Sequence, residues 1–247
     1  MSAGEKRAGE RRATLGILGG MGPAATVLLM QRIIAATPAR GDQDHIPMLV
    51  EHNPQTPSRI AALLHGAGAS PGPVLAGMAR RLQQAGADCL LMPCNTAHHY
   101  AGEITAAGAV PLLNMVELTA AKLAAVIGAG GRAGLLASPA VRLTGLYEQP
   151  LAERGLTPLY PHDDAPLLSA IELIKRRGAA PAAQRTLARA GGELQARGAA
   201  AVALACTEFS LLRDQIALDI PVIDTLDALT EAAVAFDAAL RLSLIHI

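Results

Sequence analysis

Short apolar runs alternate along the chain with longer segments in which apolar residues recur every three or four positions. The short runs predict buried β-strands, and the longer segments predict amphipathic helices. Helices of this kind are expected at residues 74–86 and 166–178, and each ends on a glycine. The alternation is typical of βα units around a parallel sheet. The predicted strands are residues 14–20, 46–52, 88–94, 110–114, 132–138, 156–160, 200–206 and 220–224.

The predicted strands fall into two sets that resemble each other. GADCLLMPC at residues 86–94 and GAAAVALAC at 198–206 both place a cysteine eight residues after a glycine. Each segment is followed by a strand with proline in its second position, VPLLN or IPVID. An internal repeat of about 110 residues predicts two similar halves that face each other across a cleft. We therefore predict an α/β protein of two doubly wound parallel-sheet domains related by pseudo-symmetry, with the active site in the cleft between them.

Composition narrows the function. The 247 residues carry 21 acidic and 21 basic side chains, and only 2% are aromatic. Neither a phosphate-binding surface nor a base-stacking platform is expected, so we predict no nucleic-acid partner. No apolar run reaches the roughly 18 residues of a membrane span, and we predict no membrane partner. Three cysteines make no disulfide framework, so reduced thiols and a cytoplasmic location are expected.

Two of the cysteines stand where polar residues follow a buried strand. Cys94 is followed by Asn-Thr, and Cys206 is followed by Thr-Glu. The carboxyl ends of parallel strands face the ligand crevice, so one cysteine is expected in each wall of the cleft. A free cysteine is often a small core residue, but the polar residues that follow these two favour a site. Cys89 lies among apolar residues and is expected in the core.

A pair of thiols suits the inversion of a carbon centre. A proton must leave one face of the carbon and another must arrive at the opposite face, so two acid/base groups have to flank one bound molecule. With an ordinary pKa of roughly 8.5, a thiol can take either role near neutral pH. The residues leave open which cysteine serves which face. A hydrolase-like dyad of Cys94 and His98 would leave Cys206 without a role, and His98, His99 and Glu103 are better explained as a helix surface than as metal ligands.

Four motifs, in this order and spacing, resemble the cofactor-independent aspartate racemases of the aspartate/glutamate racemase superfamily: LGILGGMGPAAT, NPQTPSR, MPCNTAH and ACTE. The resemblance runs from about Thr14 to the 220s, and the paired CNT and CTE motifs are its most diagnostic part. Glutamate racemases open with a DSG-type loop where this chain has GGMGP, so glutamate is less favoured as main substrate. The resemblance implies an isomerase that uses no cofactor or metal, acts on a small amino acid, most favourably aspartate, and forms a homodimer.

The resemblance also implies roles for individual residues. Cys94 and Cys206 match the catalytic cysteines, and Arg59 and Lys175 match the arginine and lysine that the family uses near the substrate carboxylates. An isolated arginine or lysine is usually a surface residue, but a guanidinium can pair with a carboxylate in a bidentate manner. Backbone amides at helix starts and in glycine-rich loops suit anions, and Glu208 suits either an ammonium group or its own helix end. The remaining predicted substrate-binding residues are Met21, Asn95, Thr96, Ala97, Thr207 and Glu208.

In this superfamily the closing helix returns to the first domain. We therefore expect residues 13–115 with 225–241 to form a domain that carries Cys94, and residues 116–224 to form a domain that carries Cys206. Residues 1–12 are expected to be a disordered tail. Residues 242–247, LSLIHI, match the translation of a transposase end sequence used to prepare sequencing libraries, and our hypothesis is a non-native end, with an ordinary apolar helix end as the alternative.

Two classes of alternative stay open at this point. The first is another enzyme of the superfamily: a glutamate or broad-specificity amino-acid racemase, a hydantoin racemase, a maleate isomerase, or a decarboxylase. The second is a binding protein for small carboxylates that has no catalytic activity.

Overall fold

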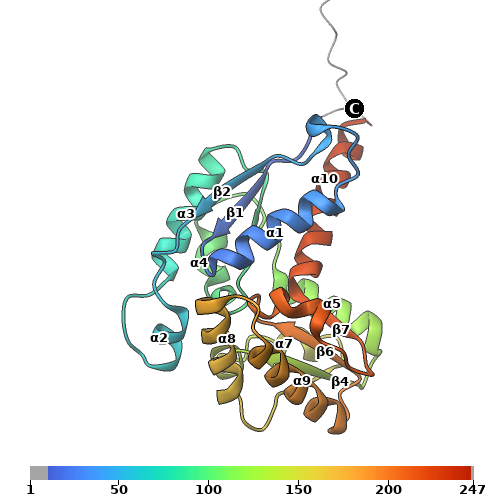
Figure 1. The fold of residues 1–247 in the computed structure, drawn as a ribbon. Coiled ribbons are helices and arrows are strands. Elements are labelled where there is room, and N and C mark those ends of the chain that lie inside the picture. Colours follow the sequence, from blue (N-terminus) through green and yellow to red (C-terminus); the bar gives the residue numbers. More distant parts are fainter. Residues whose placement is uncertain (1–10, 246–247) are drawn as a thin grey trace, which may run out of the picture.

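The computed structural model describes residues 11–245, which form two parallel sheets, one above the other in Figure 1. The first sheet has the strand order β2-β1-β3, and the second has the order β5-β4-β6-β7. Helices cover both faces of each sheet, which confirms the predicted fold class. The strands are β1 (Leu15–Gly19), β2 (Met48–His52), β3 (Cys89–Leu91), β4 (Arg132–Ala137), β5 (Thr157–Leu159), β6 (Ala201–Ala205) and β7 (Val222–Asp224).

The repeat expected from the sequence is present in the strand order. In each half the first strand lies in the middle of the sheet and pairs with the second and the third strand of that half. A single bridge from Leu90 to Leu112 takes the place that β7 has beside β6. The predicted strand 110–114 is therefore wrong as a full strand. The chain leaves the sheet there because the Asn114 side chain accepts hydrogen bonds from Val116 and Glu117 and starts a helix.

The alanine of the Gly-Ala pair in each half packs against a glycine of the middle strand. Gly16 in β1 faces Ala87, and Gly134 in β4 faces Ala199. A Cβ atom at Gly16 would lie 2.8 Å from the Ala87 Cβ atom, and one at Gly134 would lie 3.2 Å from the Ala199 Cβ atom. These glycines let the turn that precedes the third strand lie directly against the middle strand. The two halves therefore repeat a close contact as well as a strand order.

The helices divide between the two sheets. Two apolar clusters flank the first sheet, one around Leu18 and Leu90 and the other around Leu15 and Leu91. The second sheet has clusters around Leu136 and Leu135 in the same way. The helices are α1 (Pro23–Ala36), α2 (Arg59–Leu64), α3 (Gly72–Gln84), α4 (Ala101–Ala106), α5 (Met115–Ile127), α6 (Pro139–Leu143), α7 (Glu148–Ala152), α8 (Ala165–Arg177), α9 (Pro181–Ala196) and α10 (Thr225–Ile245), with 3₁₀ helices η1 (Asp42–Asp44), η2 (Thr96–Tyr100) and η3 (Phe209–Gln215).

The predicted helices at 74–86 and 166–178 correspond to α3 and α8, each shifted by one or two residues. The last helix, α10, runs back along α1 in Figure 1. Its residues Leu226, Leu229 and Ala233 pack in the cluster that also contains Leu15 of the first sheet. This packing supports the division into 13–115 with 225–241 and 116–224, which we keep as a proposal. No helix within residues 11–245 is both long and apolar enough to span a membrane.

The chain ends differ in part from expectation. Arg11 and Arg12 were expected in a disordered tail, but they form ion pairs with Asp88 at 2.6 Å and Asp237 at 2.5 Å. The buried Asp237 carboxylate also accepts a hydrogen bond from the Ala13 N–H group, which holds this segment against α10. The rest of the predicted tail, residues 1–10, lies outside the described residues. Of the predicted non-native end, residues 242–245 continue α10, and residues 246–247 lie outside the described residues.

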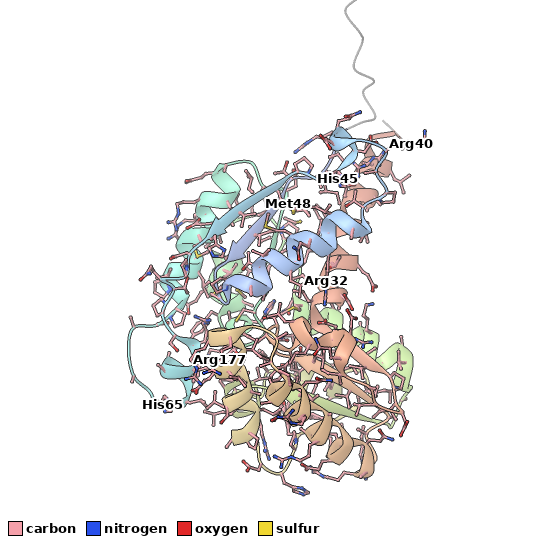
Figure 2. The ribbon with its side chains drawn as sticks, in the orientation of Figure 1. Arg32, Arg40, His45, Met48, His65 and Arg177 are labelled. Atoms are coloured by element: carbon pink, nitrogen blue, oxygen red, sulfur yellow. The ribbon has the colours of Figure 1, made fainter. Side chains whose placement is uncertain are left out.

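An ion-pair cluster joins the two halves at Arg32 of α1, which Figure 2 labels on the side that faces the second sheet. Its guanidinium lies 2.7 Å from the Asp224 carboxylate and 2.9 Å from that of Asp227. It also donates to the carbonyl oxygen of Ser210. The Asp224 side chain is fully buried, so its charge depends on Arg32 for compensation.

We expect Arg32→Met to lower the free energy of unfolding by about 3 kcal/mol, because it leaves the buried Asp224 charge unpaired. Asp227→Asn is the matched control: the Asp227 side chain is 46% exposed, so its loss should cost less than about 1 kcal/mol. Urea denaturation of both variants measures the two values. Equal effects would mean that burial of Asp224 is not what makes Arg32 important.

Candidate active site

A pocket with about 390 Å³ of empty space lies where the carboxyl ends of β3 and β6 meet, and both cysteines line it. The pocket walls come from both halves of the chain. Every predicted site residue except Ala97 lies on this pocket: Met21, Arg59, Cys94, Asn95, Thr96, Lys175, Cys206, Thr207 and Glu208. Four residues that were not predicted complete the lining: Ser58, Ile60, Ser138 and Ile171.

The two pocket cysteines lie at different distances along the chain from the ends of their strands. Cys206 directly follows β6, as predicted. Cys94 lies three residues beyond β3, so the predicted strand 88–94 is too long. Pro93 explains the early end, since proline has no N–H group for the strand ladder. Cys89 is fully buried in β3, where burial raises the pKa of its thiol to about 12 and keeps it neutral.

The Cys206 thiol has a carboxylate partner. Its Sγ atom donates a hydrogen bond to Glu208 Oε2 at 3.1 Å, and Glu208 Oε1 lies 3.4 Å from the Lys175 ammonium. Burial, together with the nearby Glu208 charge, raises the pKa of Cys206 well above its ordinary value, while Lys175 acts in the opposite direction. These contacts favour the thiol form of Cys206. Glu208 therefore does not serve only to cap its helix.

Arg59 offers a cation without a carboxylate partner among the described residues. It stands in the first turn of α2, which begins where the Ser58 hydroxyl accepts a hydrogen bond from the Ala61 N–H group. The Arg59 Nη1 atom donates only to backbone carbonyls, of Thr56 and Pro57. Its Nε atom is buried and has no hydrogen-bond partner in the described part of the chain. Such a donor suits a carboxylate brought by a ligand.

The residues that follow the cysteines hold the two halves together. The Thr207 hydroxyl donates to the carbonyl oxygen of Pro93, at 3.0 Å, across the pocket. The Tyr147 hydroxyl donates to Asn95 Oδ1 at 2.6 Å, and Asn95 Nδ2 donates to the Thr225 hydroxyl at 3.0 Å. The side chain of Asn95 thus has protein partners at both ends. The predicted contact of Asn95 with the substrate therefore stays a prediction about its backbone N–H group.

A third bond across the pocket joins Thr96 Oγ1 to Ser138 Oγ at 3.0 Å. Ser138 follows β4, just as the predicted loop around Met21 follows β1. The repeat could therefore have pointed to Ser138, whereas no local signal indicates Tyr147, a fully buried residue far from any motif. Ala97 is also fully buried and packs in the apolar cluster beneath Cys94. Its side chain does not line the pocket, so the predicted contact of Ala97 with the substrate stays a prediction about its backbone N–H group.

His98 supports the Cys94 loop rather than its thiol. Its Nδ1 atom lies 2.9 Å from the Cys94 carbonyl oxygen, and its Nε2 atom accepts a hydrogen bond from the Met115 N–H group. These partners require the neutral ring with its proton on Nδ1. Burial lowers the pKa of His98 to about 4. No cluster of three potential metal ligands occurs among residues 11–245.

Comparison with known proteins agrees with this geometry. A family model described as Asp/Glu/Hydantoin racemase matches residues 18–233, so the chain belongs to this family of isomerases. An aspartate racemase from Picrophilus torridus has a solved structure that is 29% identical in sequence, with a TM-score of 0.80, and the match covers 92% of this chain and 94% of that one.

The chain is also similar to two further proteins. The broad specificity amino-acid racemase RacX of Bacillus subtilis (strain 168) is 27% identical over 232 residues, which are 90% of this chain and 96% of RacX. A glutamate racemase isoform from Bacillus anthracis is 17% identical, with a TM-score of 0.68, over 94% of this chain and 83% of that one. The second likeness shows the fold alone. Together with the family model, these matches identify the chain as an isomerase of the amino-acid racemase type.

His98 should make stability depend on pH in the acid range. Its pKa falls from 6.5 to about 4 in the folded protein, so the unfolded chain binds a proton first as the pH drops. The contribution of the neutral His98 ring to the free energy of unfolding is complete above pH 6.5. It is lost between pH 6.5 and 4 and amounts to about 3 kcal/mol in all. Urea denaturation across this range measures the loss. His98→Gln should remove it and the exposed His99→Gln should not; an unchanged pH dependence in His98→Gln would contradict the assignment.

Proposed function

We propose that the protein is a cofactor-independent racemase that interconverts L- and D-aspartate, with Cys94 and Cys206 as its acid/base pair. One observation carries the proposal: a cysteine from each half of the repeat lines the same small pocket, together with Arg59 and Lys175. A binding protein would need the carboxylate-binding groups but not two thiols. A single-cysteine enzyme would leave one thiol without a role.

The charges around the pocket support an acidic substrate. Aspartate brings two carboxylates and one ammonium group, and the pocket brings the two cations Arg59 and Lys175 and the carboxylate of Glu208. The pocket thus offers a group of opposite charge for each charged group of aspartate, which limits the cost of burying them. We assign the side-chain carboxylate to Arg59, because this cation has no carboxylate partner within residues 11–245.

The α-carboxylate has a separate set of donors in this proposal. The backbone N–H groups of Asn95 and Thr207 directly follow the two cysteines and have no hydrogen-bond partner in the described structure. Such groups suit an anion, and they would also stabilise the charge that moves onto the carboxylate when the α-proton leaves. The ammonium group is assigned to Glu208. In this arrangement the α-carbon lies between the two thiols.

The proposed reaction moves one proton off the α-carbon and another onto it. In the resting protein Cys206 is the thiol, because burial and its contact with Glu208 raise its pKa. Cys94 is then the base: its thiolate takes the α-proton and becomes a thiol. Cys206 gives its proton to the opposite face and becomes a thiolate, and the product is the other enantiomer. The reverse direction begins from the exchanged protonation states, so no cofactor or metal is needed.

A homodimer and a cytoplasmic location, both expected from the sequence, remain parts of this proposal.

We expect Cys94→Ala and Cys206→Ala each to lower the rate of aspartate racemisation at least a hundredfold, since a positioned acid or base contributes about 10²–10⁴. Cys89→Ala is the matched control and should keep near wild-type activity, because Cys89 is buried in β3 away from the pocket. Chiral chromatography measures racemisation, and circular dichroism checks the fold. Near wild-type racemisation by either pocket variant would exclude the two-thiol mechanism.

Arg59 should determine the preference for aspartate. We expect Arg59→Met to reduce kcat/KM for aspartate about 10- to 100-fold more than kcat/KM for alanine, because a charge-assisted hydrogen bond contributes about 1.5–3 kcal/mol. The control is Arg80→Met, which removes an exposed arginine on α3 and should change neither value. Equal losses for the two amino acids would assign Arg59 to the α-carboxylate or to the fold.

A further inference from the structure

A second cavity adjoins the catalytic pocket. It is partly open to solvent, and we call it the annex. Arg59, Lys175 and Glu208 line both the pocket and the annex, so these three charged side chains form the border between the two spaces. The other annex walls come from the loop after β1, the first turn of α1, η3 and α8; Figure 1 shows α1 beginning close to α8.

The annex differs from the pocket in its chemistry. Apart from the three border residues, its lining has no charged side chain: it consists of glycines, alanines and prolines together with Ile174 and Leu211. The border can donate a further hydrogen bond, because the Arg59 Nε atom is buried without a hydrogen-bond partner in the described chain. A ligand that lies in the annex would therefore meet polar groups only at the border and apolar surface beyond it.

The local backbone keeps the annex open. Gly20 has a φ angle of +96°, and a Cβ atom there would lie 2.4 Å from the carbonyl carbon of Asn53. The loop after β1 can therefore lie tightly on the loop after β2, which only glycine allows at this position. At Gly22 a Cβ atom would come within 3.2 Å of Glu208 Oε1. The lack of a side chain at Gly22 leaves the space in front of Glu208 free.

We propose, on the basis of the function proposed above, that the annex receives the outer part of substrate side chains longer than that of aspartate. An aspartate side chain ends at the border, where its carboxylate meets Arg59. A longer apolar side chain passes the border and buries its end against the annex walls. The enzyme therefore also racemises amino acids with long, unbranched, apolar side chains, such as methionine and norleucine. Ala24, an exposed residue that lines the annex and not the pocket, is the position from which a larger side chain would fill this space.

The alternative role for the annex is an approach route that every substrate uses before it reaches the cysteines. The two roles differ in one measurable respect. A side-chain subsite affects only long substrates, whereas an approach route affects aspartate and methionine alike. Filling the annex without touching the pocket therefore distinguishes them.

The experiment measures solvent deuterium exchange at the α-position of aspartate, methionine and norleucine by proton NMR, for the full-length protein. The wild type is expected to exchange all three. Ala24→Phe should lower exchange of methionine and norleucine at least tenfold and leave that of aspartate within about twofold, in line with the selectivity of apolar pockets. Val27→Phe is the matched control, since Val27 lies on the same helix, is 50% exposed and does not line the annex. Leu211→Ala, which widens the annex, should raise exchange of norleucine relative to aspartate.

Each other outcome overturns a definite statement. If the wild type exchanges aspartate but neither longer amino acid, the annex is not a substrate subsite and the proposed function stands. If Ala24→Phe lowers exchange of all three equally while Val27→Phe does not, the annex is an approach route. If the wild type exchanges the longer amino acids but not aspartate, the annex proposal holds and the aspartate assignment fails. If it exchanges none of them, both proposals fail.

Discussion

The position of one half of the chain relative to the other is the constraint on which the site depends. Cys94 and Cys206 are far apart in the sequence and share a pocket only because the two sheets meet at their carboxyl ends. Three buried hydrogen bonds cross this junction: Thr207 to Pro93, Tyr147 to Asn95, and Thr96 with Ser138. Their donors and acceptors would be unsatisfied and buried if the halves separated slightly, so the junction favours one arrangement. The residues next to the cysteines thus define the spacing of the thiols.

The electrostatics of the pocket follow from an asymmetry between two similar halves. The residue two positions after Cys94 is a threonine, whereas the residue two positions after Cys206 is Glu208. The carboxylate gives Cys206 a hydrogen-bond acceptor and pairs with Lys175. A symmetric fold therefore holds two chemically different thiols. An enzyme that inverts a carbon needs such a difference at every moment, because one acid/base group must be protonated while the other is not.

Much of the fold could be predicted because the repeat is visible in the local order of apolar and polar residues. Buried strands, the Gly-Ala turns and the two cysteines all occur at matching places, and short-range periodicity is enough to find them. The errors lie where long-range packing overrides that pattern. Residues 110–114 look like a strand but make only one bridge to the sheet. The local sequence of this segment does not show where its pairing with the sheet stops.

The sequence by itself determined the α/β architecture, the twofold repeat and the two thiols of interest, since each depends on residue type and spacing along the chain, whereas the two cations were singled out only through the family resemblance. Only the tertiary structure decided which groups meet: that Glu208 pairs with Lys175, that Arg59 has no carboxylate partner among the described residues, and that an apolar annex adjoins the pocket. These features arise from contacts between residues that are distant in sequence. Such contacts depend on how helices and sheets pack, and local sequence patterns do not predict them.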